Sequence, residues 1–351
     1  MTKKEIIYHL KDIQHYYGNT KVLDIADLKI ERGSITGLIG PNGSGKSTLL
    51  KLLAFAQKPT RGHIFYKGRI ELPFSPTIRS KVTLLTQKPY LLKRTVFENI
   101  AYGLKIRKDK TLLNERVKKA LLTVGLDDQK FAVRKWHELS GGEAQRVAMA
   151  ARLILKPEVL LLDEPIASVD TESAGLIRKA SLKARDNWGA TLVIASHDLQ
   201  WLYSISDRQL SIFKGNIFST GLENIITGPF IKSGVKSGIN LDGKTFVKKL
   251  DDGQIITLKA LGKKTCTTAV IRKKNISISL EKQPDNGLLN QLSGHIVSML
   301  LEKKKGIIMA TISVHNLAFI LRLTTDQISN NNLYPGKKVI LKFHSNNVEW
   351  I

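Results

Sequence analysis

The stretch that most constrains this chain is residues 40–48, with the sequence GPNGSGKST. It follows an apolar run at 34–39 that predicts a buried strand, and it precedes a strong helix former at 49–53. A strand, a glycine-rich turn and a helix form the setting in which G-x-x-x-x-G-K-[ST] indicates a phosphate-binding loop. The predicted loop consists of Gly40, Pro41, Asn42, Gly43, Ser44, Gly45, Lys46, Ser47 and Thr48. The chain is therefore predicted to bind a nucleoside triphosphate.

Two side chains of this loop have a predicted chemical role. Lys46 can reach the β- and γ-phosphates, and the Ser47 hydroxyl can bind Mg²⁺. The glycines let backbone N–H groups approach the anion, and the new helix adds the positive end of its dipole.

Three further apolar runs end in polar residues. Gln87 follows the run at 82–86, where its amide oxygen can reach the metal ion or its water. Asp163 and Glu164 follow a run at 159–162 that is typical of a strand buried in a parallel sheet. The ligand edge of such a sheet is at the carboxyl ends of its strands, so Asp163 is expected to hold Mg²⁺ and Glu164 to accept a proton from water.

His197 follows the third run, at 191–195, and is expected at the same edge in contact with the γ-phosphate. Farther from the loop, the LSGGE stretch predicts a helix with Ser140 as N-cap and Glu143 at N3. It is either a second anion-facing helix end or an ordinary capped helix. Tyr17, in a turn between two alternating strands, could stack on a base, although a tyrosine that fills a turn is the simpler interpretation.

Length and composition indicate how many domains the chain forms and of which kind. A chain of 351 residues with 42% hydrophobic and 24% charged residues is expected to form about two or three globular domains. It has no apolar run of about 20 residues and no apolar secretory leader, and its single cysteine, Cys266, cannot form an internal disulfide. After Gly221 the segments become short and β-rich, which predicts an all-β, small-barrel region joined near residues 227–229.

The formal net charge of +25 is spread along the chain without a long basic tract. Such diffuse charge is typical of a protein that acts beside an anionic membrane surface, or it reflects a lysine-rich proteome. We rank binding to nucleic acid below both explanations.

Taken in order, these motifs resemble the nucleotide-binding domain of ABC transporters over roughly residues 4–225. The resemblance implies an α/β P-loop NTPase with antiparallel β and helical subdomains, binding ATP and Mg²⁺. It implies that Tyr17 stacks on adenine, that Glu164 is the general base, and that His197 contacts the γ-phosphate. It also implies a head-to-tail homodimer in which one copy completes the other's site with residues Ser140, Gly141, Gly142, Glu143 and Asp170. Ile166 departs from the family's pattern, in which threonine is commoner.

The region 226–351 resembles the TOBE or Mop-like domains that follow such ATPases, an OB/TOBE-like all-β fold expected here in two halves, about 230–285 and 286–351. The likeness is carried by residues 270–276, 290–297, 323–325 and 333–339. Mop-like oxyanion sites have Ser-Ala-Arg before the asparagine that corresponds to Asn290. In this chain Gly287-Leu288-Leu289 takes its place. Lys342, Ser345 and His295 are the remaining candidates for holding an oxyanion, and weak or no oxyanion binding is expected.

The resemblance implies an ATPase subunit of an importer, with tungstate or molybdate as the leading solute. Sulfate, a polyamine or another solute is the alternative, followed by an ATPase acting on nucleic acid or ribosomes. No coiled-coil insertion separates Lys46 from Ser140 and no zinc cysteines occur, so we expect no nucleic-acid partner. The expected partners are membrane permease subunits and a solute-binding protein, which places the chain on the cytoplasmic face of the membrane.

Overall fold

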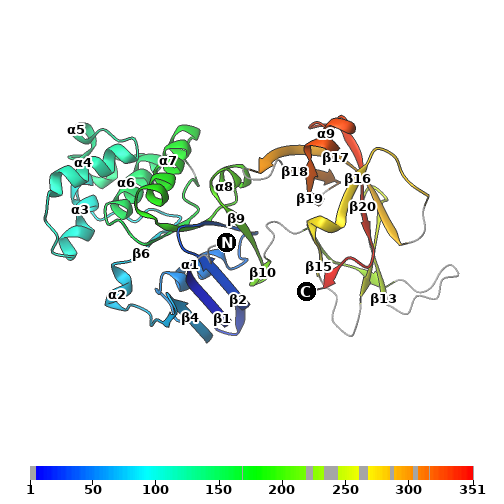
Figure 1. Ribbon diagram of the computed structural model, residues 1–351, viewed down its shortest axis with the longest axis horizontal. Coiled ribbons are helices and arrows are strands. Elements are labelled where there is room, and N and C mark those ends of the chain that lie inside the picture. The colour runs from blue at the N-terminus through cyan, green and yellow to red at the C-terminus, as the bar shows by residue number, and fades with distance from the viewer. Residues whose placement is uncertain are drawn as a thin grey trace. The chain divides into compact units, whose positions relative to one another are not determined.

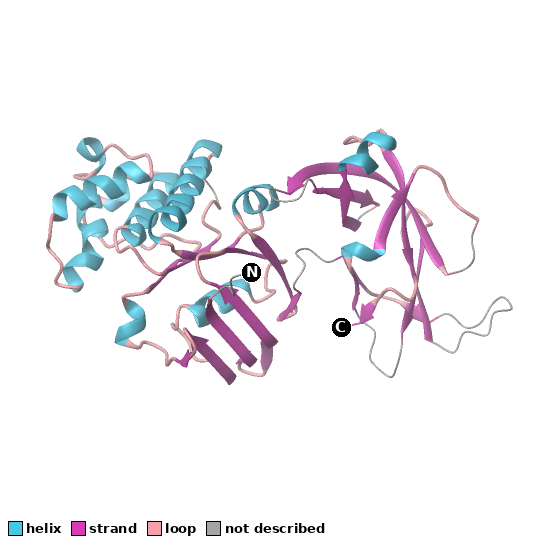
Figure 2. Cartoon of the chain, viewed as in Figure 1, coloured by secondary structure: helices cyan, strands magenta, loops and turns pink. Residues whose placement is uncertain are grey.

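The computed structural model describes residues 5–167, 169–218, 224–232, 244–260, 268–284, 288–302, 307–315 and 317–350. The chain divides into two compact units, Met1–Gly221 and Leu222–Ile351. In Figure 2 the first unit combines sheets with most of the helices, whereas the second is built almost entirely of strands.

The first unit contains a six-stranded sheet in the order β10-β9-β3-β8-β7-β6. Its strands are β3 (Ile35–Ile39), β6 (Val82–Leu85), β7 (Val159–Asp163), β8 (Thr191–Ala195), β9 (Arg208–Phe213) and β10 (Asn216–Phe218). All neighbours pair in parallel except β10 and β9. Every residue of β3, β7 and β8 is buried, as continuous apolar runs predict for a covered parallel sheet.

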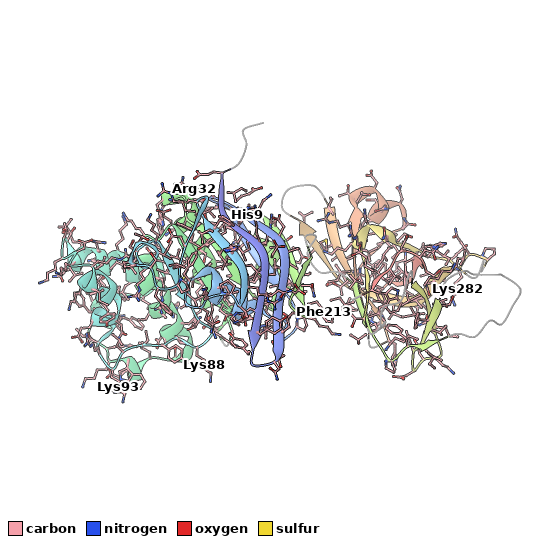
Figure 3. All side chains as sticks on the ribbon, turned by 90° about the horizontal axis from the view of Figure 1, so that it is seen from below. His9, Arg32, Lys88, Lys93, Phe213 and Lys282 are labelled. Atoms are coloured by element: carbon pink, nitrogen blue, oxygen red, sulfur yellow. The ribbon has the colours of Figure 1, made fainter. Side chains whose placement is uncertain are left out.

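A second, antiparallel sheet has the order β2-β1-β4-β5. Its strands are β1 (Ile6–Tyr17), β2 (Thr20–Glu31), β4 (Arg61–Tyr66) and β5 (Arg69–Ile70). Polar side chains on β1 and beyond β2 form surface ion pairs: His9 with Asp27 at 2.5 Å and Arg32 with Glu5 at 2.8 Å (Figure 3). The two sheets share one hydrophobic core with α1 (Lys46–Leu53), whose leucines at 49, 50, 52 and 53 are fully buried.

The other helices of the first unit include the cluster labelled α3 to α7 in Figure 1. They are α2 (Pro76–Arg79), α3 (Val96–Ile106), α4 (Leu113–Thr123), α5 (Asp128–Phe131), η1 (Trp136–Glu138), α6 (Gly141–Leu153), α7 (Thr171–Trp188) and α8 (Leu199–Ile205). The α6 helix packs against α3, α4 and α7. In the described parts of the chain, no helix combines the length and apolar character that crossing a membrane requires.

The described residues of the second unit form three antiparallel sheets, ordered β11-β15-β21, β12-β13-β14 and β16-β20-β17-β18-β19. The strands are β11 (Asn224–Thr227), β12 (Ile231–Lys232), β13 (Lys244–Lys249), β14 (Ile255–Ala260), β15 (Thr268–Ile271), β16 (Ile276–Ser279), β17 (Leu289–Glu302), β18 (Ile307–Val314), β19 (Leu317–Thr324), β20 (Lys338–His344) and β21 (Glu349–Trp350). The described part of this unit also includes the short helices η2 (Lys273–Asn275) and α9 (Thr325–Asn330).

Two expectations about this unit differ from the structure. β11 pairs with β15, so residues 227–229 connect strands inside the second unit and do not join the two units. The expected halves 230–285 and 286–351 do not form separate sheets either, because β16 pairs with β20 and β15 pairs with β21. Short β-rich segments reveal strands but not their partners, since pairing is decided by contacts that are distant in sequence.

Candidate functional site

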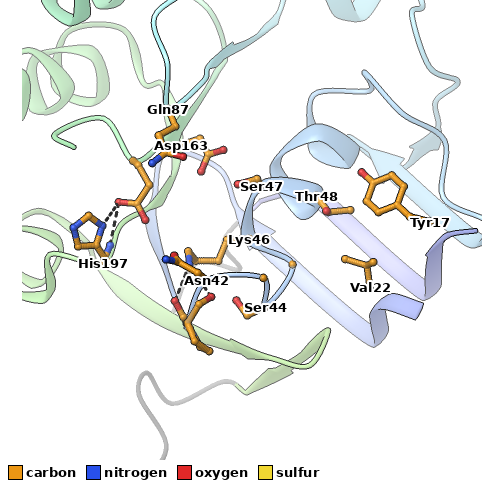
Figure 4. A pocket seen from close by; sticks show the side chains of 15 residues that line it. Tyr17, Val22, Asn42, Ser44, Lys46, Ser47, Thr48, Gln87, Asp163 and His197 are labelled. Carbon is orange, nitrogen blue, oxygen red and sulfur yellow. Dashed lines mark hydrogen bonds and ion pairs between the residues drawn. The ribbon is translucent and has the colours of Figure 1, made fainter. Parts of the chain in front are cut away.

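The residues predicted to bind nucleotide line one pocket of about 840 Å³ in the first unit (Figure 4). The lining consists of Tyr17, Val22, the whole loop at 40–48, Gln87, Asp163, Glu164 and His197. The loop links β3 to α1. Gln87 follows β6, the acid pair lies at the end of β7 with Asp163 as its last residue, and His197 follows β8. Because these strands are parallel, their carboxyl ends lie at one edge and bring together residues far apart in sequence.

Two glycines of the loop are required by close packing. A Cβ on Gly40 would lie 2.2 Å from the Ile212 carbonyl oxygen on β9. Gly45 has a φ of +108°, and a Cβ there would lie 2.7 Å from the Leu23 side chain. Any larger residue at either position would displace the loop that carries the backbone N–H groups.

Lys46 is the buried cation of the pocket. Its side chain is only slightly exposed, and its Nζ donates to the carbonyl oxygens of Gly40 at 2.7 Å and Pro41 at 3.1 Å. Burial lowers the pKa of Lys46, and the Glu164 and Asp163 carboxylates oppose that shift. The ammonium group is therefore held inside the turn, facing two acids.

Glu164 and His197 form a contact across the sheet edge. The His197 Nδ1 lies 2.8 Å from Glu164 Oε2, and the His197 backbone N–H donates to the same oxygen at 3.2 Å (Figure 4). The Glu164 side chain is 8% exposed and that of His197 is 70% exposed. Glu164 has a φ of +48°, a conformation that is uncommon for a non-glycine residue and is often found at functional sites.

Asp163 lines the pocket together with the phosphate loop. Its Oδ1 is buried and has no hydrogen-bond partner among the described residues. Burial raises the pKa of Asp163, while the Ser47 hydroxyl and Lys46 partly oppose the shift. A buried carboxylate oxygen without a partner is the arrangement that a bound cation satisfies.

Tyr17 lines the far end of the pocket at the end of β1. Its hydroxyl donates to Gln57 Oε1 at 2.9 Å, and the His15 ring packs edge-on against it with centroids 5.0 Å apart. Tyr17 is 46% exposed and lines the pocket, so its side chain is accessible there. Val22, on β2, lines the same region and was not singled out from the sequence, where it is one of several apolar residues in an alternating strand.

The LSGGE residues lie outside this pocket. Ser140 caps α6: its hydroxyl accepts from the Glu143 N–H at 3.3 Å, and Glu143 Oε2 accepts from the Ser140 N–H at 2.8 Å. A Cβ on Gly142 would lie 3.6 Å from Asp170, which itself caps α7 by accepting from the Ser173 N–H at 2.8 Å. Ser140, Gly141, Gly142, Glu143 and Asp170 are thus gathered at the ends of two helices but do not line the pocket of their own chain. Ser168, which precedes α7 in the sequence, lies outside the described residues.

The comparisons with known proteins agree with this geometry. Residues 23–167 match the family model described as ABC transporter. The tungstate uptake system ATP-binding protein TupC of Peptoclostridium acidaminophilum is 38% identical over 209 residues, which are 59% of this chain and 95% of that protein. The spermidine/putrescine import ATP-binding protein PotA of Mycoplasma capricolum is 32% identical over 302 residues, 81% of this chain and 83% of that protein.

A third relative, the Fe(3+) ions import ATP-binding protein FbpC 1 of Pectobacterium atrosepticum, is 36% identical over 63% of this chain and 62% of its own length. Among solved structures, the dimeric structure of MJ0796, a bacterial ABC transporter cassette, matches with a TM-score of 0.56 and 27% identity over 60% of this chain and 96% of that one. The α/β P-loop fold expected from the sequence is therefore confirmed, followed by an all-β region. The chain belongs to the ABC transporter family as an import-type ATP-binding protein and an ATPase.

Proposed function

We propose that this ATPase energises uptake of an oxyanion, with tungstate or molybdate the leading solute, through separate membrane subunits. The observation that carries the proposal is the similarity to TupC, which extends over 95% of that protein.

A polyamine is the second candidate, and a specific observation favours it. The similarity to TupC covers 209 residues, whereas that to PotA covers 302 residues and so extends into the second unit. If the second unit helps to determine which permease the ATPase binds, this wider similarity supports polyamine uptake.

In the proposed site, the loop at 40–48 cradles the phosphates of ATP, and Tyr17, which is partly exposed in the pocket, stacks on adenine. Lys46 supplies a charge that no other loop residue supplies, and its present partners are neutral carbonyl oxygens that a phosphate can replace. The helix N-terminus of α1 adds N–H groups directed at the same anion.

The residues also fit Mg²⁺, which would be held by the Ser47 hydroxyl, the Gln87 amide oxygen and Asp163. The unpartnered Oδ1 of Asp163 is the observation that supports this ligand set. The described residues contain no group of three or more His, Cys, Asp or Glu that could hold a metal, so phosphate oxygens and water are expected to complete the coordination. When bound, Mg²⁺ neutralises charge on the phosphate oxygens.

Glu164 is proposed to act as general base, taking a proton from the water that attacks the γ-phosphorus. Its buried carboxylate is held in place by both the ring and the backbone of His197. His197, mostly exposed on the pocket side, is proposed to contact the γ-phosphate with its other ring nitrogen while Nδ1 stays on Glu164.

We further propose that two copies pair head to tail, so that Ser140, Gly141, Gly142, Glu143 and Asp170 complete the partner's site. This pairing accounts for a capped helix end that lies outside its own chain's pocket. The first unit, predicted as residues 4–225, is proposed as the ATPase domain, and the second unit, predicted as residues 226–351, as a TOBE/Mop-like domain. The division between the two units lies between Gly221 and Leu222. The proposed partners are permease subunits and a solute-binding protein, with the chain at the cytoplasmic face of the membrane.

Size-exclusion chromatography tests the pairing. A Glu164→Gln chain should elute at twice the monomer mass with Mg·ATP, because it retains the phosphate cradle but cannot consume the nucleotide. A Glu164→Gln chain that also carries Ser140→Arg should stay monomeric, since arginine blocks the second helix end. If both variants behave alike, the head-to-tail arrangement is wrong.

The solute is tested in proteoliposomes that contain the chain with its permease and solute-binding protein. ATP hydrolysis should rise when tungstate or molybdate is added and not when spermidine is added. Stimulation by spermidine alone would establish the second candidate instead.

A further inference from the structure

The first unit contains a second cavity that shares no residue with the nucleotide pocket. It has a volume of about 500 Å³ and lies among α4, the carboxyl end of α6 and the carboxyl end of α7. Figure 1 shows these three helices side by side, with α6 between the other two. The volume falls within the range of about 300–1,000 Å³ that is usual for small-molecule sites.

The floor of this cavity is apolar. It is formed by Ala120 on α4 and by Leu153 and Ile154 at the end of α6, all of them buried. One wall is the half-buried indole of Trp188, whose Nε1 donates to the Pro157 carbonyl oxygen at 3.0 Å. Because that hydrogen bond fixes the indole, the cavity offers a preformed flat surface against which a planar group can stack.

The rim is strongly basic. Lys119 on α4, Lys156 after α6 and Lys183 on α7 line the cavity, are exposed, and form no ion pair within the described ranges. Arg116 also lines it, but its guanidinium is held by Asp109 at 2.6 Å. Three ammonium groups from three separate elements therefore surround an apolar floor without an acidic side chain among the lining residues.

From this combination we infer that the cavity binds a small organic anion with a flat apolar body and a carboxylate, sulfonate or phosphate group. The apolar body lies on the floor and against the indole of Trp188. The anionic group lies at the rim, where the lysine ammonium groups can converge on it. The enclosed floor limits the occupant to a small molecule, and the three unpaired cations select against a neutral or cationic one.

Two fluorescent probes of nearly the same shape test this inference on the full chain. 8-Anilinonaphthalene-1-sulfonate carries an anionic group, and N-phenyl-1-naphthylamine is its uncharged counterpart. The sulfonate should bind saturably and quench tryptophan emission by energy transfer, and Trp188→Phe should remove most of that transfer.

The charge requirement is tested by replacing Lys119, Lys156 and Lys183 together with glutamine. This variant should bind the sulfonate about tenfold more weakly, as expected for the loss of three exposed charge contacts. Its affinity for the uncharged probe should change less than about twofold, because the apolar contacts are retained. These three positions are exposed, so the variant should fold normally.

A matched control replaces Lys88, Lys93 and Lys130 with glutamine. These lysines are exposed and do not line the cavity (Figure 3 labels the first two). The control has the same net charge as the triple rim variant and should bind the sulfonate like the unmodified chain. Equal weakening in both triple variants would show a general charge effect and overturn the inference. Displacement of the probe by saturating ATP would place it in the nucleotide pocket and would overturn the inference as well.

Discussion

The first unit contains a mainly parallel sheet beside its antiparallel one, whereas the described strands of the second unit all pair antiparallel. In the first unit, β3, β7 and β8 are parallel neighbours, so the loop at 40–48, the acid pair at 163–164 and His197 meet at one edge. In the second unit, the strands pair antiparallel, and polar residues that look related in sequence are distributed along and across the sheet. Parallel order places the residues at the carboxyl ends of neighbouring strands at one edge of the sheet, whereas antiparallel order places such residues at alternating edges.

The oxyanion candidates of the second unit illustrate this difference. Lys342 on β20 is opposite Gln291 on β17, while His295 is opposite Lys338. Lys342 and His295 are therefore displaced by four residues, roughly 13 Å along the strands at about 3.3 Å per residue. Ser345 follows the end of β20, where its N–H donates to the Leu288 carbonyl oxygen at 2.8 Å. These three residues do not form a common anion site.

The largest effect is expected for Glu164→Gln, which removes the proposed base while retaining the shape of the pocket. We expect ATP hydrolysis to fall by about 100- to 10,000-fold, as is usual when a general base is lost. ATP affinity should be unchanged, because Glu164 contacts His197 and not the phosphate cradle. Steady-state phosphate release and calorimetric ATP binding measure the two quantities. A variant that still hydrolyses ATP at more than a tenth of the normal rate would exclude Glu164 as the base.

A second prediction compares two buried lysines, Lys46 in the first unit and Lys342 in the second, which are 6% and 9% exposed. Lys46→Ala should weaken ATP binding about 10- to 150-fold, the loss expected for hydrogen bonds between a cation and phosphate. Lys342→Ala should leave ATP affinity unchanged, because it lies in a sheet that provides no residue to the nucleotide pocket. Calorimetry on both variants measures the difference, and equal ATP affinities for the two would contradict the assignment of Lys46.

The residues that line the pocket of the first unit were easier to predict from the sequence than the strand pairing of the second unit. The difference has a physical reason. Local patterns identify the phosphate loop, the buried strands and the Ser140–Glu143 capping box, and parallel order then brings the strand ends together. Val22 could not be predicted as a lining residue, because its position depends on how β2 passes beside the loop. In the second unit, the strands were predictable but their partners were not, since β16–β20 and β15–β21 join segments more than 60 residues apart in the sequence.

A third prediction uses two capping boxes of the same kind, one in each unit. Ser140 caps α6 with Glu143, and Thr324 caps the short α9 with Gln327. Replacing either cap by alanine should lower the free energy of unfolding of its own unit by about 0.5–2 kcal/mol. Only Ser140→Ala should also lower the ATPase rate, because only that helix end is proposed to meet the partner's nucleotide. Chemical denaturation and phosphate release measure the two effects, and a similar loss of ATPase in Thr324→Ala would attribute the effect to stability alone.

The smallest signal is expected when tungstate or molybdate is added to the chain, because we predict that the second unit does not bind an oxyanion. Its described residues do not bring Lys342, Ser345 and His295 together, and Leu288 and Leu289 stand where Mop-like sites place polar ligands. Diffuse lysines that are screened by salt do not replace converging donors. The measurement is equilibrium dialysis of the full chain with tungstate or molybdate at physiological salt, using a Lys46→Ala background because the phosphate loop can itself bind an oxyanion. We expect no saturable binding at micromolar concentration. If binding is found and is lost in Lys342→Ala, Lys342 belongs to an oxyanion site that the second unit builds with side chains other than His295, and the two units differ less than their sheets indicate.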